Sequence, residues 1–199
     1  MTTKVDEWEI EAEKVQFPSM LEERIDTDLL QKGIILLYGE LNEENCHRVC
    51  KKLIYLKECM KGKKKVRIIL NSIGGEVYHG LLIYNTIQDM IKSGMTVEIE
   101  ARGLCASMGV IILVAGNHRS ASKYTRFLLH EVSGSFEYGK TSELKEQSAE
   151  LETLNLVLDE LLSSRCKISV EKLQKITRKK DLWISAEEAL KYGLIDTIV

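Results

Sequence analysis

A serine among small residues is the side chain in this sequence best placed to do chemistry. Ser107 lies within Gly103-Leu104-Cys105-Ala106-Ser107-Met108-Gly109-Val110. It follows an alternating run typical of a strand and precedes an apolar run, residues 110–115, typical of a buried helix. Free N–H groups and partial positive charge at a helix N-terminus stabilise an alkoxide or a tetrahedral oxyanion. Ser107 is therefore either a nucleophile or a simple cap on a core helix.

A serine nucleophile needs a histidine to accept its proton. His130 ends the strand predicted after the serine unit, where a parallel sheet would bring it to the same edge as Ser107. His79, just behind a glycine pair, is the competing base, and position favours His130. His47 and His118 fall on a charged helix face and in a polar segment, so we expect both to be solvated.

The carboxylate that would orient the histidine is less determined, because the chain has 30 Asp and Glu. Asp181 is favoured because it follows a basic run and precedes an extended piece containing Trp183. Spacing alone does not select it. Gly74-Gly75, at a strand-to-helix junction, either lets a bound backbone approach closely or forms a plain tight turn.

Alternating strands and helices must position these residues. Hydrophobic periodicity predicts strands over 34–38, 66–70, 96–102, 125–130 and 194–199, a brief extended piece over 181–184, and a surface loop over 117–123. It predicts helices over 42–61, 108–115, 141–163, 169–179 and 185–193, and one after Gly75 that carries Leu82 to Ile91 and is ended by Ser93-Gly94. This order indicates an α/β fold with right-handed crossovers and a mainly parallel sheet. We expect an N-terminal arm over 1–22 and one domain over 23–199, with the long helix over 141–163 projecting toward another subunit.

Composition excludes several classes of protein. With 44% hydrophobic and 29% charged residues the chain is typical of a soluble globular protein, and a net charge of -2 argues against nucleic acid as a partner. No run suits a signal peptide or a membrane span. The five cysteines lack zinc or redox spacing, which indicates reduced thiols in a cytoplasmic protein. Cys46 and Cys50 share a helix face and could help bind a metal, but core packing is favoured.

Several segments in unbroken order resemble ClpP, the family of proteolytic subunits of the Clp protease. The resemblance runs from about Ile25 to Val199. It rests on Asn71-Ser72-Ile73-Gly74-Gly75, Cys105-Ala106-Ser107-Met108-Gly109, Phe127-Leu128-Leu129-His130, Asp181-Leu182-Trp183-Ile184-Ser185-Ala186-Glu187-Glu188-Ala189 and Tyr192-Gly193-Leu194-Ile195-Asp196.

The resemblance implies a ClpP/crotonase-like fold of repeated β-β-α units and a Ser107, His130 and Asp181 triad, with Gly75 and Met108 as oxyanion-hole amides. It implies a serine endopeptidase that cleaves unfolded polypeptides inside two stacked heptameric rings. No cofactor or metal is expected on this chain, because ATP is used only by a partner AAA+ unfoldase. The long helix over 141–163 resembles the family's ring-to-ring handle.

Some positions depart from the family pattern. Glu131-Val132 stand where Gln-Pro is usual, Ile73 replaces a common proline, and the first 20 or so residues do not match the hydrophobic axial loop. The alternatives are a catalytically silent ring subunit, a phage-type head-maturation protease, and an acyl-CoA enzyme of the crotonase superfamily, which also uses paired amides as an oxyanion hole.

Overall fold

The centre of the molecule is a mainly parallel sheet. The computed structural model describes residues 17–59, 65–134, 140–178 and 180–199. Within them the sheet order is β1-β2-β3-β4-β7, with β5 paired to β3 and β6 paired to β5. Every pairing is parallel except that of β5 with β6, which confirms the predicted α/β class. The strands are β1 (Ile34–Leu41), β2 (Lys65–Gly75), β3 (Thr96–Ala106), β4 (His118–Ala121), β5 (Arg126–Leu129), β6 (Leu182–Ile184) and β7 (Thr197–Ile198).

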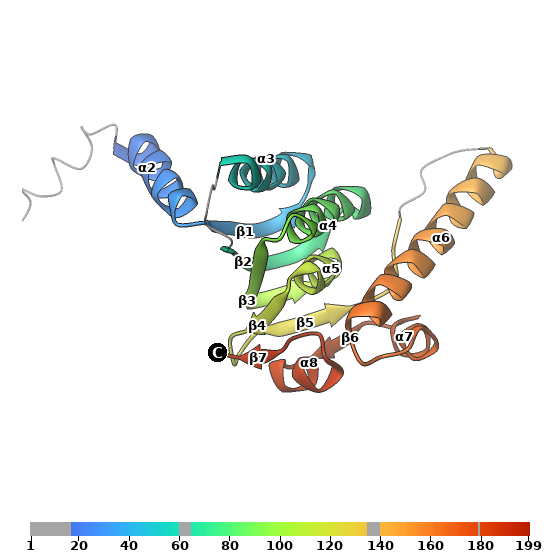
Figure 1. Cartoon of the computed structure of the whole chain (residues 1–199). Helices are drawn as coiled ribbons and strands as arrows, with labels where there is room; N and C mark the ends of the chain where they lie inside the picture. The colour runs from blue at the N-terminus through green and yellow to red at the C-terminus, as the bar shows by residue number, and fades with distance from the viewer. Residues whose placement is uncertain (1–16, 60–64, 135–139, 179) are drawn as a thin grey trace, which may run out of the picture.

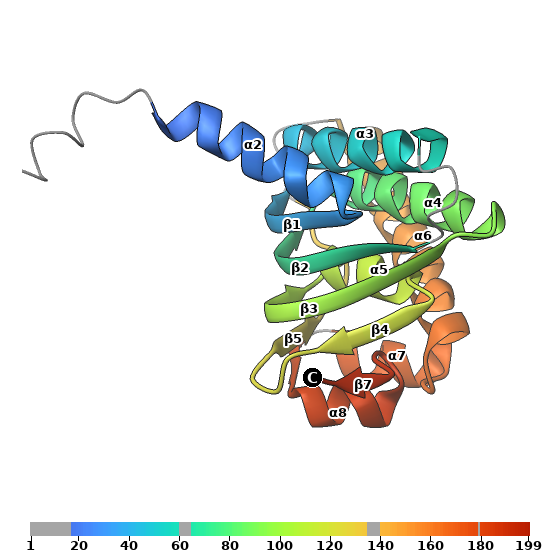
Figure 2. The same ribbon diagram turned by 60° about the vertical axis from the view of Figure 1, so that its left-hand side comes forward.

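Helices connect the strands and cover one face of the sheet (Figures 1 and 2). In β1, Ile35 and Leu37 are buried, whereas Leu36 and Tyr38 on the opposite face are 36% and 49% exposed. The core therefore lies on the side of α3, α4 and α5. The helices are α2 (Phe17–Gln31), α3 (Glu43–Cys59), α4 (Val77–Lys92), α5 (Met108–Ala115), α6 (Thr141–Arg165), α7 (Val170–Thr177) and α8 (Ala186–Tyr192). Among the described helices none is long and apolar enough to cross a membrane.

Local sequence signals explain where several elements begin and end. Ser185 and Glu188 form the predicted capping box of α8, and Gly193 ends that helix in the left-handed conformation. Every residue of α5 is buried, as its unbroken apolar sequence predicts. Cys46 and Cys50 lie in the core, with 0% and 4% of their surfaces exposed. Helix α6 projects beyond the body of the molecule (Figure 1).

The structure corrects some predicted boundaries. The segment over 117–123, predicted to be a loop, contains strand β4, which pairs with β3 and β7. Strands β2 and β3 extend to Gly75 and Ala106, further than predicted. Their pairing with neighbouring strands resumes after a shift of register and includes residues of the two glycine- and serine-containing motifs. The chain is helical from Phe17, inside the segment expected to be an arm, and residues 1–16 lie outside the described part.

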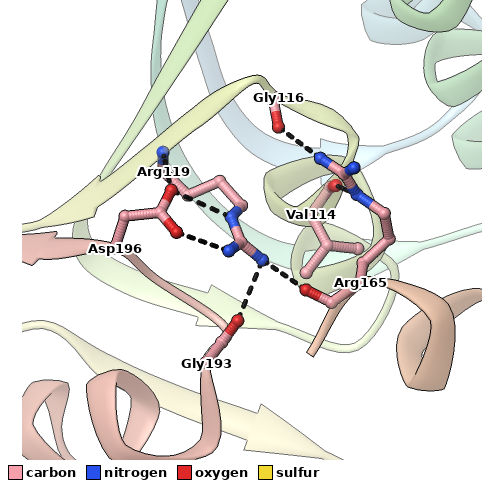
Figure 3. Close-up of polar contacts among 6 residues, drawn as sticks. All are labelled: Val114, Gly116, Arg119, Arg165, Gly193 and Asp196. Carbon is pink, nitrogen blue, oxygen red and sulfur yellow. Dashed lines mark hydrogen bonds and ion pairs between the residues drawn. The ribbon is translucent and has the colours of Figure 1, made fainter. Parts of the chain in front are cut away.

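Two arginines tie the C-terminal part of the chain to the helix that follows Ser107 (Figure 3). Arg119 on β4 forms an ion pair with Asp196 and donates hydrogen bonds to the carbonyls of Arg165 and Gly193. Arg165, at the end of α6, donates to the carbonyls of Val114 and Gly116 at the end of α5, at 2.9 and 2.7 Å. A cation at a helix C-terminus complements the helix dipole. Helices α5 and α6 are therefore fixed to each other at this end.

The Asp196 carboxylate contributes to this connection in its charged form. Burial alone would raise the pKa of Asp196, but hydrogen bonds from the Arg119 side chain and backbone, together with the guanidinium charge, lower it. A lowered pKa in the folded state stabilises the protein above the unfolded value of about 3.9, and this stabilisation is lost as the pH falls further.

We predict that Asp196→Asn lowers the free energy of unfolding at pH 7 by about 1–2 kcal/mol, because a hydrogen-bonded ion pair with the largely buried Arg119 is weakened. The difference from the native chain should narrow as the pH falls below about 4. Urea unfolding at pH 7 and at a pH below about 4 measures this difference in unfolding free energy. Asp89→Asn is the matched control, since Asp89 lies 4.0 Å from Lys92 and both are exposed. Equal losses in the two variants would contradict the prediction.

Candidate active site

Ser107 occupies an unusual backbone conformation at the junction of β3 and α5. Among the residues that the structure describes it is the one non-glycine residue with a positive φ, 54°. Such backbone costs about 1–3 kcal/mol and persists only where the surroundings impose it. The Ser107 N–H donates to the Leu128 carbonyl at 2.8 Å, and its side chain makes no capping hydrogen bond to α5. Ser107 is therefore the N-cap residue of α5 by position, but its hydroxyl does not cap the helix.

The glycine pair packs directly against Ser107. Gly74 and Gly75 have φ values of 89° and 148°. A Cβ added to Gly74 would lie 2.6 Å from the Ser107 Cβ, and one added to Gly75 would lie 2.5 Å from the Leu41 carbonyl oxygen. Both positions require glycine because of backbone angle and space together. The plain-turn interpretation does not explain this close approach.

Ser72 holds this glycine segment in place, a role that the sequence analysis missed. It is 1% exposed. Its hydroxyl donates to the Gly39 carbonyl at 2.6 Å and accepts from the Gly74 N–H at 3.1 Å. A buried hydroxyl needs such partners, so the serine fixes β1 and the glycine pair relative to each other. Its place directly before the glycines in the motif was the available signal.

Strand register explains how residues far apart in the sequence meet. In the parallel pair, Ala106 of β3 lies opposite Leu128 of β5, so Ser107 and His130 follow at neighbouring strand ends. In the antiparallel pair, Leu129 lies opposite Leu182, so Asp181 comes at the same end of that ladder as His130. All three predicted triad residues therefore come at one edge of the sheet, where α/β folds place their sites.

One pocket brings four of the five predicted site residues together. Ser107, His130, Gly75 and Met108 all line it. Asp181 does not line this pocket and is exposed. Within the described part of the chain no hydrogen bond or ion pair joins Ser107 to His130 or His130 to Asp181. The single chain thus brings four of the predicted residues to one pocket and leaves the predicted Asp181 outside it.

The other candidate groups lie in different surroundings. His79 is in the first turn of α4, with Nδ1 2.8 Å from Glu76 Oε2, and does not line the pocket. Cys105, two residues before Ser107, is fully buried, and this burial raises the pKa of its thiol. A neutral, buried thiol is a poor nucleophile. Among the described residues no group of three or more His, Cys, Asp or Glu could hold a metal ion.

Asn155 on α6 holds the segment that follows His130, and sequence reasoning did not identify it. Its side-chain oxygen accepts a hydrogen bond from the Val132 N–H at 2.8 Å, and its amide donates to the Leu151 carbonyl at 2.9 Å. Asn155 also lines the pocket. The long helix therefore forms one wall of the site and positions the chain beside the histidine.

Comparison with known proteins shows which family this chain resembles. Residues 20–199 match the Clp protease family. The chain belongs to the Clp protease family. It is 34% identical to the ATP-dependent Clp protease proteolytic subunit of Borreliella afzelii (strain PKo), over 86% of this chain and 85% of that protein. It is 35% identical to the ATP-dependent Clp protease proteolytic subunit 2 of Chlamydia pneumoniae, over 86% and 82% of the two chains.

Family membership agrees with the architecture. The mainly parallel sheet with its covering helices fits the ClpP fold that the motifs implied. The match to ATP-dependent Clp protease proteolytic subunit 3 of Synechococcus sp. (strain CC9605), 32% identical, extends over 91% of this chain. The shared region includes the strand ends that carry Ser107 and His130.

We predict that Gly74→Ala destabilises the chain much more than Gly94→Ala. The two glycines have nearly the same φ, 89° and 88°, but an added Cβ at Gly94 meets nothing within 4 Å. Gly94→Ala should cost about 1–3 kcal/mol for the backbone conformation alone. Gly74→Ala adds a collision with Ser107, worth about 1–3 kcal/mol more. Urea unfolding measures the loss of unfolding free energy in each variant. Equal losses would show that a side chain at position 74 does not collide with Ser107.

We predict that Asn155→Leu loosens the segment after His130, because the Val132 N–H loses its acceptor. Hydrogen exchange followed by mass spectrometry should show faster exchange in peptides covering 130–134. Thr153→Val is the control, because this substitution also removes a side-chain hydrogen bond from α6, at an exposed position. Unchanged exchange in the Asn155 variant would mean that α6 does not position this segment.

Proposed function

We propose that this chain is a serine endopeptidase that cleaves unfolded polypeptides, with Ser107 as nucleophile and His130 as general base. The observation that carries the proposal is the uncapped, positive-φ Ser107 at the start of buried helix α5, lining one pocket with His130. Membership of the Clp protease family supports it.

The pocket residues account for each step of peptide cleavage. His130 takes the Ser107 proton while the Ser107 oxygen bonds to the substrate carbonyl carbon, and the π electrons move to the carbonyl oxygen. The N–H groups of Gly75 and Met108 stabilise that oxyanion. Met108 is the first residue of α5, where an N–H lacks an intrahelical acceptor, and Gly75 ends β2 and lines the same pocket. His130 then protonates the leaving amine as the C–N bond breaks. Water, deprotonated by His130, attacks the acyl-enzyme and releases Ser107.

Asp181 is the proposed third member, which would orient His130 and stabilise its charged form. In the single chain it is exposed, although register places it at the end of β6 nearest His130. We infer that small movements of this edge complete the relay when subunits assemble. The exposed position also favours a second candidate function, a catalytically silent ring subunit.

We further propose assembly into two stacked heptameric rings that work with an AAA+ unfoldase in the cytoplasm. This chain would need no cofactor, because the unfoldase would use the ATP. The relatives are named ATP-dependent Clp protease proteolytic subunits, which supports a partner that uses ATP. The projecting helix α6 exposes Leu156 and Val157 by 46% and 41%, apolar surface that a second subunit would cover.

We predict that Ser107→Ala lowers kcat for hydrolysis of an unstructured peptide by at least about a thousandfold, the scale on which loss of a serine nucleophile acts. The purified oligomer is used, and size-exclusion chromatography checks that assembly is unchanged. Ser133→Ala is the matched control, since Ser133 lines the same pocket. Activity that survives Ser107→Ala would contradict the proposal. An intact oligomer with no activity in its native sequence would support the silent subunit.

A further inference from the structure

The active-site pocket contains a carboxylate that the proposed mechanism does not use. Asp159 on α6 lines the same pocket as Ser107 and His130 and is half-buried. It comes one turn after Asn155, which also faces the pocket. Its neighbour Glu160 is exposed and does not line the pocket. The carboxylate therefore borders the space that a substrate would enter.

The pocket that Asp159 lines is mostly apolar. Burial raises the pKa of Asp159, and the opposing effects of a hydrogen bond with Gln174 and of the Arg178 charge do not cancel it. Such a carboxylate is incompletely compensated, so a further donor or cation would stabilise it. The apolar walls of the pocket include Met108, Val110 and Ile111 of α5 and Leu158 and Leu162 of α6.

A neighbouring hollow carries more negative charge. Glu131, Glu152 and Arg178 line it, and it meets the first pocket at Asn155. Glu131 directly follows the candidate base. With Asp159, the two hollows hold three carboxylates against one guanidinium, and Arg178 itself is exposed. The surface that leads to Ser107 from this side therefore favours a positively charged substrate segment.

We propose that Asp159 is a specificity-determining residue and that the pocket beside Ser107 accepts a lysine or arginine side chain of the substrate. The side chain would belong to the residue whose carbonyl is attacked, called P1. These side chains have long apolar stems and a cationic end, which match apolar walls with one carboxylate. The inference rests on the proposed function, since it assumes that Ser107 is the nucleophile.

A purely structural role for Asp159 would be to hold α7 through Gln174. The variant Asp159→Asn separates the two roles, because asparagine keeps the shape and can still bond to Gln174 but carries no charge. Loss of a structural contact would affect all substrates alike. Loss of charge recognition would affect only those with a cationic P1 side chain.

The first experiment measures kcat/KM for two peptides that differ only in having lysine or norleucine at P1. Norleucine has an unbranched apolar stem without the ammonium group. We expect the native oligomer to prefer lysine about 10-fold or more, the effect of a hydrogen bond between charged groups. Asp159→Asn should abolish the preference, chiefly by lowering kcat/KM for the lysine peptide. Glu160→Gln removes a charge from the adjacent exposed position and should retain the preference for lysine.

The second experiment measures binding without catalysis. Fluorescent peptides ending in lysine or norleucine are titrated against Ser107→Ala oligomer with native Asp159 and with Asp159→Asn, and anisotropy gives Kd. Tighter binding of the lysine peptide that depends on Asp159 supports the inference even if the native chain does not cleave. Equal binding of the two peptides, or a preference unaffected by Asp159→Asn, overturns it. Failure of the proposed function shows separately, as lack of hydrolysis of both peptides by the native oligomer.

Discussion

The backbone of Ser107 is the constraint on which the rest of the site depends. Its positive φ turns the chain from β3 into α5, and its N–H is held by the Leu128 carbonyl of β5. This hydrogen bond continues the parallel pairing of β3 with β5 to Ser107, directly after β3 ends and beside the strand that ends before His130. Because α5 is buried along its whole length, it cannot shift to relieve the strain.

The neighbouring contacts keep that conformation in place from several directions. Gly74 leaves no space for a side chain beside Ser107, and Ser72 fixes the glycine segment to β1. At the far end of α5, Arg165 binds the last carbonyls and is itself connected through its own carbonyl to Arg119. Helix α6 thus makes two contacts around the site. Its Arg165 binds the end of α5, and its Asn155 holds the chain after His130. A preorganised site of this kind favours catalysis by fixed dipoles.

Much of this could be predicted from the sequence, because the dominant signals were local. Apolar periodicity located α3, α4 and α6, and the Ser185 and Glu188 pair located the start of α8. Strand β4 was missed because its residues are mostly polar and because Arg119 finds its partners far along the chain. These are Asp196, 77 positions away, and the carbonyls of Arg165 and Gly193. Asp159 was missed for a related reason. It is one acidic residue among many on α6, and only packing against α7 distinguishes it from Glu160.

The proposed relay is not closed in the single chain, because Asp181 is exposed and no hydrogen bond between described residues joins Ser107 to His130. This is why we propose that assembly completes it. The most direct test is reaction of the purified oligomer with a fluorophosphonate, followed by intact mass and peptide mapping. We predict one adduct per chain, on Ser107, and its loss in the His130→Ala variant because the base no longer activates the hydroxyl. Absence of an adduct on the assembled oligomer, or an adduct on another residue, would contradict the assignment of Ser107 as nucleophile.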